Sequence, residues 1–199
     1  MVRGKIGVFL IVLGVLLGLA AASIAGYNLW DSYRAGLAAD NAVQILVQYR
    51  EGLEAEEPEE PNDEDPEQEL PWVEIDGNRY IGTISAPSLG VELPVLEDWS
   101  LALLKLGPCR YMGSPYTGDL IICAHNYTTH FGRIGNLAPG DTVIFTDVEG
   151  NAFTYSVTQL DTIAGTAVQE MESGEWDLTL FTCTLGGQTR MTVRCTAVD

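Results

Sequence analysis

Residues 178–196 read LTLFTCTLGGQTRMTVRCT, and this stretch decides how the rest of the chain is interpreted. Residues 178–183 and 189–196 are rich in apolar and β-branched side chains, and a glycine-containing turn separates them. They therefore predict two neighbouring strands joined by a short connection. Cys183 ends the first strand and Arg190 begins the second, so we expect a thiol and a guanidinium to lie side by side.

The region from Trp72 to the C-terminus shows the same pattern throughout. Strand-like runs are split by Gly, Pro, Asp and Asn, and helical signals are short, at residues 99–106 and 129–137. The strand-like runs are residues 80–84, 91–95, 120–124, 141–147 and 152–160, of which the last two read as a hairpin around Gly150-Asn151. With the two strands above, about seven or eight short strands predict an all-β fold, either a closed barrel or a sandwich.

Both histidines of the chain lie in residues 123–130, CAHNYTTH. His125 falls where a buried strand meets a polar loop, a place where a rigid element aims a side chain and a loop gives access. A thiolate attacks carbonyls, a histidine takes or gives its proton, and a guanidinium stabilises an oxyanion. Cys183, His125 and Arg190 are therefore the candidate site of a cysteine protease or transpeptidase. We expect no catalytic role for His130, which is predicted at the surface or at a groove rim.

Arg194 lies four residues after Arg190, so both side chains point to the same face of a strand. We assign the chemistry to Arg190 and expect Arg194 in a surface ion pair. The three cysteines other than Cys183 are expected to be free, buried thiols, although a disulfide between two of them is an open alternative. With no CxxC motif and two histidines, the sequence does not predict a metal site or a cofactor.

The segment TLFTC at residues 179–183 resembles the T-L-x-T-C signature of sortases, the cell-wall transpeptidases of Gram-positive bacteria. Other segments resemble the same family in chain order. They are GTISAPSLG at 82–90, like its opening strand; HN at 125–126, like its G-H segment but with Ala124 in place of glycine; residues 131–141, like its F-x-x-L…GD stretch; and RMTV at 190–193, like its last strand.

This resemblance implies a closed, eight-stranded sortase-type β-barrel over residues 72–199. It implies that His125, Cys183 and Arg190 form the catalytic triad and that Thr182 borders the substrate groove. The implied reaction cleaves an LPxTG-like sorting signal of a surface protein between Thr and Gly. The acyl group then passes from a Cys183 thioester to an amine acceptor, a peptidoglycan precursor or another protein, which attaches proteins to the cell wall.

Two alternatives remain open. One is a non-catalytic extracellular β-domain that binds the wall or a partner protein, and the other is a cysteine endopeptidase that uses water as acceptor. The sortase class also stays open: pilus-building members typically carry an Asp-Pro-aromatic lid, whereas here Glu67 follows Asp65-Pro66.

The N-terminal segment predicts a membrane anchor. Residues 6–26 carry no charge and are long enough to span a hydrocarbon core of about 30 Å. Arg3 and Lys5 precede them, which favours a cytoplasmic N-terminus and an extracellular catalytic domain. A cleaved signal peptide is the alternative, because residues 20–22 are three alanines. We expect an anchor over residues 1–30.

A juxtamembrane helix and an acidic linker are expected over residues 31–71. Residues 51–70 carry many carboxylates and no basic side chain, which predicts an extended, self-repelling spacer. The net charge of −18, with no basic patch, argues against a nucleic-acid partner.

Overall fold

The computed structural model describes residues 2–55 and 70–198, so most of the expected acidic linker, and with it Asp65-Pro66, lies outside the described residues. Helix α1 runs from Val2 to Ala55. The chain divides into two compact units, Met1–Arg34 and Ala35–Asp199.

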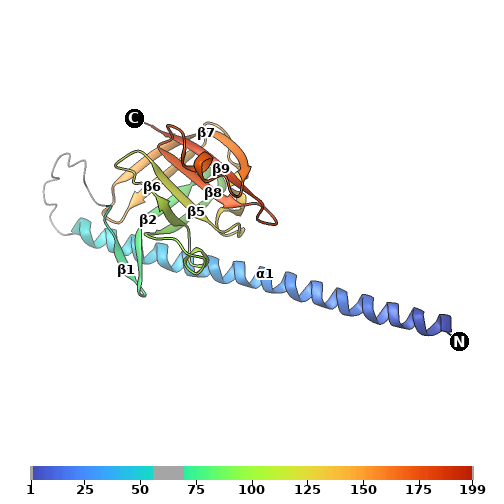
Figure 1. Cartoon of the computed structure of the whole chain (residues 1–199). Coiled ribbons are helices and arrows are strands. Elements are labelled where there is room, and N and C mark those ends of the chain that lie inside the picture. The colour runs from blue at the N-terminus through green and yellow to red at the C-terminus, as the bar shows by residue number, and fades with distance from the viewer. Residues whose placement is uncertain (1, 56–69, 199) are drawn as a thin grey trace. The chain divides into compact units, whose positions relative to one another are not determined.

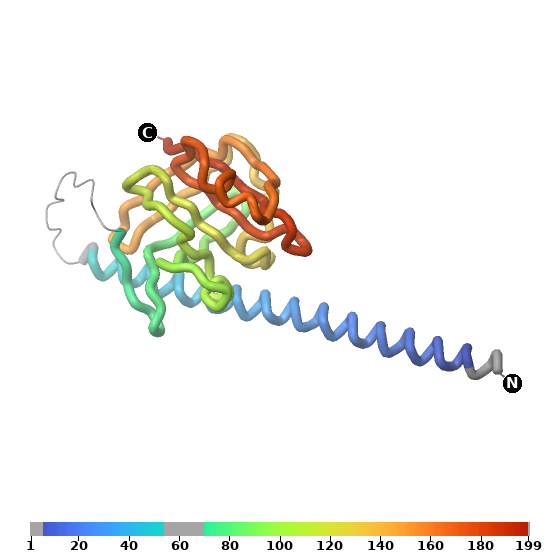
Figure 2. The backbone as a smooth tube through the Cα atoms, in the orientation of Figure 1, coloured from blue at the N-terminus to red at the C-terminus, as the bar shows by residue number. Residues whose placement is uncertain are grey.

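The second unit contains one sheet closed into a barrel (Figure 1). The strand order is β1-β2-β3-β4-β5-β8-β9-β7-β6, and β2 also pairs with β6, which closes a ring of eight strands and leaves β1 outside it. Figure 2 follows the backbone around this ring, from green β2 and β3 to red β8 and β9. The predicted eight-stranded barrel is therefore confirmed. The strands are β1 (Val73–Ile75), β2 (Asn78–Ala86), β3 (Val91–Leu96), β4 (Cys109–Met112), β5 (Leu120–Ala124), β6 (Thr142–Asp147), β7 (Ala152–Ala164), β8 (Leu178–Cys183) and β9 (Thr189–Ala197).

Four short helices connect the strands: η1 (Pro87–Leu89), η2 (Leu103–Lys105), η3 (Phe131–Asn136) and α2 (Val168–Glu172). The helices η2 and η3 fall inside the two segments where the sequence predicts helices. The sequence gives no strong signal for α2, which has five residues and no side-chain N-cap. Such a short helix depends on tertiary contacts for its stability.

Strand β5 explains how two hydrophobic clusters share the barrel wall. All five of its residues are buried. Leu120, Ile122 and Ala124, which point to one face of the strand, belong to a cluster that also contains Phe145 and Leu180. Cys123 belongs to a second cluster, which contains Leu46 of α1. A strand covered on both faces is apolar at every position, which is why residues 120–124 read as a continuous apolar run.

The second half of α1 packs on the barrel (Figure 1, where the cyan turns lie beside β1 and β2). The buried residues Ala35, Ala39, Ala42 and Leu46 recur at helical spacing and form one stripe. The contact is close, because a Cβ atom on Gly36 would lie 2.9 Å from the Thr129 methyl group. The compact unit that contains the barrel therefore begins at Ala35, whereas the sequence predicts a barrel from residue 72 and a separate helix before it.

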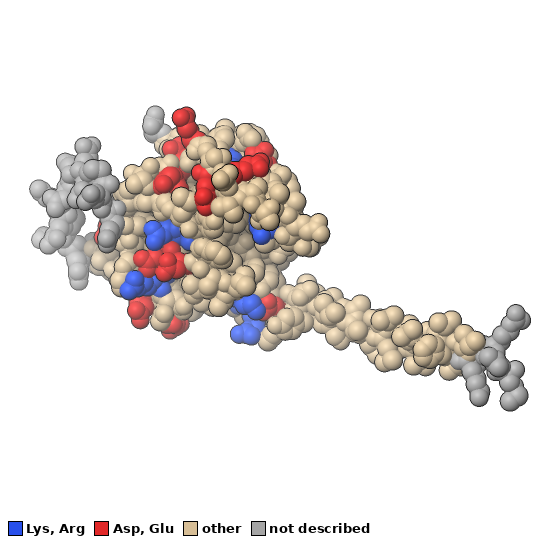
Figure 3. All heavy atoms as spheres, viewed as in Figure 1, with Lys and Arg blue, Asp and Glu red and all other residues tan. Residues whose placement is uncertain are grey.

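The N-terminal unit contains the apolar part of α1. Residues 6–30 carry no charged side chain, as the tan stretch in Figure 3 shows. By length and composition this part of α1 could cross a membrane, although a signal sequence has the same properties. An N-terminal apolar helix of this kind supports membrane anchoring.

Candidate active site

Cys183 and Arg190 face each other across two antiparallel strands. They are direct partners in the register of β8 and β9. The turn between these strands contains Gly186 and Gly187 in the left-handed region, with φ of 85° and 71°, where other residues are strained. Arg190 Nη1 donates hydrogen bonds to the carbonyl oxygens of Gly187 (2.8 Å) and Thr189 (3.1 Å). The turn thus holds the guanidinium at the strand end where Cys183 lies.

Strand β5 brings His125 to the same end of the barrel. It runs parallel to β8, and Ala124 is the register partner of Thr182. His125 and Cys183 are the next residues along the two strands. The buried Thr182 hydroxyl donates a 2.9 Å hydrogen bond to the carbonyl oxygen of Ala124. Thr182 therefore joins the two strands, and its side chain does not line the pocket described next.

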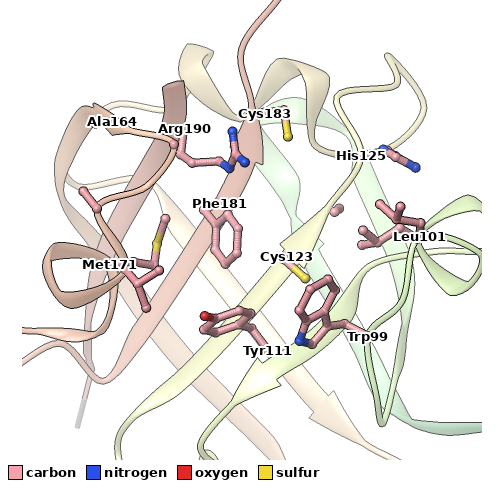
Figure 4. A pocket seen from close by; sticks show the side chains of 15 residues that line it. Trp99, Leu101, Tyr111, Cys123, His125, Ala164, Met171, Phe181, Cys183 and Arg190 are labelled. Atoms are coloured by element: carbon pink, nitrogen blue, oxygen red, sulfur yellow. The ribbon is translucent and has the colours of Figure 1, made fainter. Parts of the chain in front are cut away.

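One pocket of about 280 Å³ is lined by Cys183, His125 and Arg190 together. Figure 4 shows Cys183 between Arg190 on one side and His125 on the other, above aromatic side chains. Among these, the ring of Tyr111 lies 5.9 Å from that of Trp99 and 5.4 Å from that of Phe181, between centroids. The remaining lining residues are mostly apolar: Leu101, Leu104, Cys123, Ala124, Ala164, Gly165, Ala167, Val168 and Met171.

The aromatic lining could not be identified from the sequence. Tyr111 belongs to β4, a strand that the sequence does not clearly predict, and Trp99 precedes η2 in an irregular segment. The partly buried Phe181 provides the only signal, because it lies two residues before Cys183 and therefore on the same face of β8.

The His125 ring is turned away from Cys183 in Figure 4. The ring contacts that of Tyr127, with 4.9 Å between ring centroids. The structure thus brings the three predicted side chains to one pocket, while the imidazole faces the loop. Catalytic hydrogen bonds are often loose without substrate and tighten only when it binds.

Arg194 is buried, so the prediction of a surface ion pair is wrong. It is 4% exposed. Its Nη1 donates to the Met171 carbonyl oxygen (2.7 Å) and to Thr179 Oγ1 (2.9 Å), and its Nη2 donates to the Glu170 carbonyl oxygen (2.7 Å). The reason is that α2 covers this part of β9. Burial lowers the pKa of Arg194.

His130 is also buried, so its predicted surface or groove-rim position is wrong. It is 1% exposed, and neither ring nitrogen has a hydrogen-bond partner among the described residues. Burial lowers the pKa of His130 to about 4. The nearby Ala35 backbone raises this pKa, but by less than burial lowers it. His130 lies in the loop against which α1 packs, which explains its burial.

We expect His130 to make the protein less stable in acid. Its pKa is about 4 when folded and about 6.5 in the unfolded chain, so the unfolded state binds an extra proton between these values. Stability should be full above pH 6.5 and should fall as the pH drops toward 4, by about 3 kcal/mol at most. Urea unfolding at pH 7 and pH 4.5 measures this loss. His130→Phe should lose less stability than the wild type, and equal losses would contradict the assignment.

The four cysteines are free, and only Cys183 is partly exposed. Burial raises the pKa of Cys123 and of Cys195 to about 12 and raises that of Cys109 further. Because the thiolate is the nucleophile, these three thiols are poorly suited to attack. Cys123 lines the pocket, as its position two residues before His125 suggests.

Comparison with known proteins shows the family of the chain. A family model described as Sortase domain matches residues 84–198, more than half of the chain. The chain belongs to the sortase family. A sortase A of Bacillus anthracis is 27% identical to this sortase over 183 residues, which cover 86% of the chain and 85% of that protein.

Solved sortase structures share the fold of this sortase. Sortase A from Corynebacterium diphtheriae superposes with a TM-score of 0.56 at 20% identity, over 90% of this chain and 96% of that one. Sortase C from Clostridium perfringens SM101 gives 0.55 at 23% identity, over 81% and 90% of the two chains. Because similar scores arise from sortases A and C, the comparison leaves the class of this sortase open.

Proposed function

We propose that this sortase is a membrane-anchored cysteine transpeptidase that cleaves an LPxTG-like sorting signal between Thr and Gly and transfers the acyl group to an amine. The observation that carries the proposal is the convergence of Cys183, His125 and Arg190 on one otherwise apolar pocket. The three groups supply a nucleophile, a proton carrier and an oxyanion donor. The apolar lining suits the apolar side chains at the start of such a signal.

The first half of the reaction forms a thioester. The Cys183 thiolate attacks the threonine carbonyl carbon, and the Arg190 guanidinium donates hydrogen bonds to the oxyanion that forms. As the C–N bond breaks, the protonated His125 gives its proton to the leaving glycine amine. The Arg190 guanidinium is already held near Cys183 by the β8–β9 turn, so it needs little reorganisation.

The second half releases the product. An amine of a peptidoglycan precursor or of another protein attacks the thioester carbonyl carbon, and His125 takes the proton that this amine loses. The C–S bond breaks, a new amide is formed, and Cys183 returns as thiolate. In an endopeptidase, water would take the place of the amine.

A peptide assay tests the proposal. The full-length protein in detergent is incubated with a fluorogenic LPxTG-like peptide, with and without triglycine. We expect cleavage after threonine, and the product should carry triglycine when it is present. Cleavage to the free acid alone would support an endopeptidase. Absence of both cleavage and Cys183 labelling by a thiol-reactive probe would support the non-catalytic domain.

Topology is part of the proposal. Residues 6–26 would hold the chain in the membrane with Arg3 and Lys5 on the cytoplasmic side, and the barrel would act outside on surface proteins. Cysteine-specific labelling of intact cells with an impermeant reagent, applied to a Cys183→Ala chain with a cysteine added at residue 2 or at Glu149, separates the two orientations, because Cys183 is itself partly exposed. Labelling at residue 2 alone would reverse the proposed orientation.

Removing the Arg190 guanidinium should lower turnover strongly. Loss of one oxyanion donor typically costs about 10²–10³ in kcat. We expect this loss for Arg190→Ala, with KM for the sorting peptide changed less. The matched control is Arg79→Ala, because the Arg79 side chain is 52% exposed and does not line the pocket. Steady-state kinetics measure both variants, and equal kcat values would exclude Arg190 as the donor.

A further inference from the structure

Helix α2 forms one wall of the Cys183 pocket through Val168 and Met171 (Figure 4 labels Met171). With only five residues, α2 cannot be stable by itself, and the carbonyl groups at its C-terminal end lack partners within the helix. The last turn of α2 contains no basic side chain of its own. Other parts of the chain must therefore hold this wall in place.

Arg194 holds α2 from the barrel side. Its guanidinium donates to the carbonyl oxygens of Glu170 and Met171, both at 2.7 Å, and to the Thr179 hydroxyl on β8. A cation at a helix C-terminus is favourable, because it bonds the free carbonyls and meets the negative end of the helix dipole. The same three bonds compensate the burial of the guanidinium. One side chain on β9 thus joins α2 to the strand that ends at Cys183.

Tyr111 holds the same helix from the opposite side of the pocket. Its hydroxyl group donates a 3.1 Å hydrogen bond to Glu172 Oε1, at the end of α2. Tyr111 also lines the pocket and packs against Phe181. Three hydrogen bonds therefore join α2 to the barrel and to the aromatic side chains: two from Arg194 and an exposed one from Tyr111.

We propose that Arg194 is a positioning residue that fixes the α2 wall and thereby determines which apolar side chain of the substrate the pocket accepts. The proposal rests on the proposed peptide substrate. Arg190 and Arg194, on the same face of β9, then have different roles. Arg190 stabilises the charge formed during the reaction, and Arg194 sets the shape of the pocket beside it.

Arg194→Met tests this role, because it keeps an unbranched side chain and removes all donors. In the full-length protein in detergent, we expect KM for a leucine-containing LPxTG-like peptide to rise about tenfold or more, with kcat reduced less than about threefold. The preference for leucine over alanine at the first motif position should fall about tenfold. Arg194→Lys should recover part of this preference, and Arg79→Met, an exposed guanidinium deletion, should retain it. A loss of kcat with unchanged KM and unchanged preference would overturn the proposal.

Two further measurements cover the other outcomes. Tyr111→Phe removes only the hydroxyl group that bonds Glu172, so this variant should fold. It is the variant to measure if Arg194→Met does not melt cooperatively. A loss of leucine preference in Tyr111→Phe, smaller than that expected for Arg194→Met, would support the proposal that the position of α2 sets the preference, and an unchanged preference would overturn it. Hydrogen exchange of the amides of residues 168–173 should become faster in Arg194→Met, and unchanged exchange would also overturn the proposal. Exchange needs no substrate, so if the wild type cleaves no sorting peptide, the proposed function fails while the role of Arg194 in holding α2 is still decided.

Discussion

Cys183→Ala is expected to abolish thioester formation and peptide cleavage. The three other thiols are buried with raised pKa values, so none of them can replace the missing nucleophile. The barrel should remain folded, because Cys183 is partly exposed at a strand end and belongs to neither hydrophobic cluster. Intact-protein mass spectrometry after incubation with a sorting peptide should show the acyl adduct only in the wild type.

The control for this experiment is Cys123→Ala. Cys123 lines the same pocket, so its loss is expected to change the rate, but the acyl adduct should still form on Cys183. A melting curve of Cys183→Ala that matches the wild type separates lost chemistry from lost folding. Residual cleavage by Cys183→Ala at an appreciable fraction of the wild-type rate would mean that another group is the nucleophile.

Removing the docked half of α1 should destabilise the barrel severely. A chain that starts at Leu70 lacks Ala42 and Leu46, which belong to the same hydrophobic cluster as Tyr80 and Leu96, and Ala39, which belongs to the other cluster. Exposing these clusters is expected to cost several kcal/mol, a large part of the about 5–15 kcal/mol that stabilises a typical domain. A chain that starts at Ala35 keeps the whole compact unit and should be soluble, folded and able to cleave short peptides.

Single substitutions in α1 give a matched test of the contact between this helix and the barrel. Leu46 is 1% exposed and Leu37 is 52% exposed in the same helix. In the chain that starts at Ala35, Leu46→Ala should lower the free energy of unfolding by about 2–5 kcal/mol, and Leu37→Ala by less than about 0.5 kcal/mol. Urea unfolding measures both. Equal stability of the chains that start at Ala35 and at Leu70 would show that the helix contributes nothing to the barrel.

The strands could be predicted from local sequence, and so could the end of the barrel at which Cys183, His125 and Arg190 lie. Alternation and turn residues identify β8 and β9, and the short connection between them leaves Cys183 and Arg190 opposite each other. His125 could be placed at a strand end because the apolar run of β5 stops there. Strand β1 and helix α2 were not predicted, since three and five residues carry too little periodicity.

The sequence by itself determined the succession of short strands, the apolar N-terminal helix and the residues of the candidate site, because side-chain periodicity and motif spacing are properties of neighbouring residues. Periodicity alone leaves a barrel and a sandwich open, and the closed barrel follows from the family resemblance that the motifs carry. Only the tertiary structure decided that Arg194 and His130 are buried and that the compact unit around the barrel extends to Ala35. Periodicity places Arg190 and Arg194 on the same face of a strand, but it does not say what covers that face. Helix α2 covers one arginine and leaves the other at the pocket, and α1 covers His130, so burial there results from contacts between segments far apart in the chain.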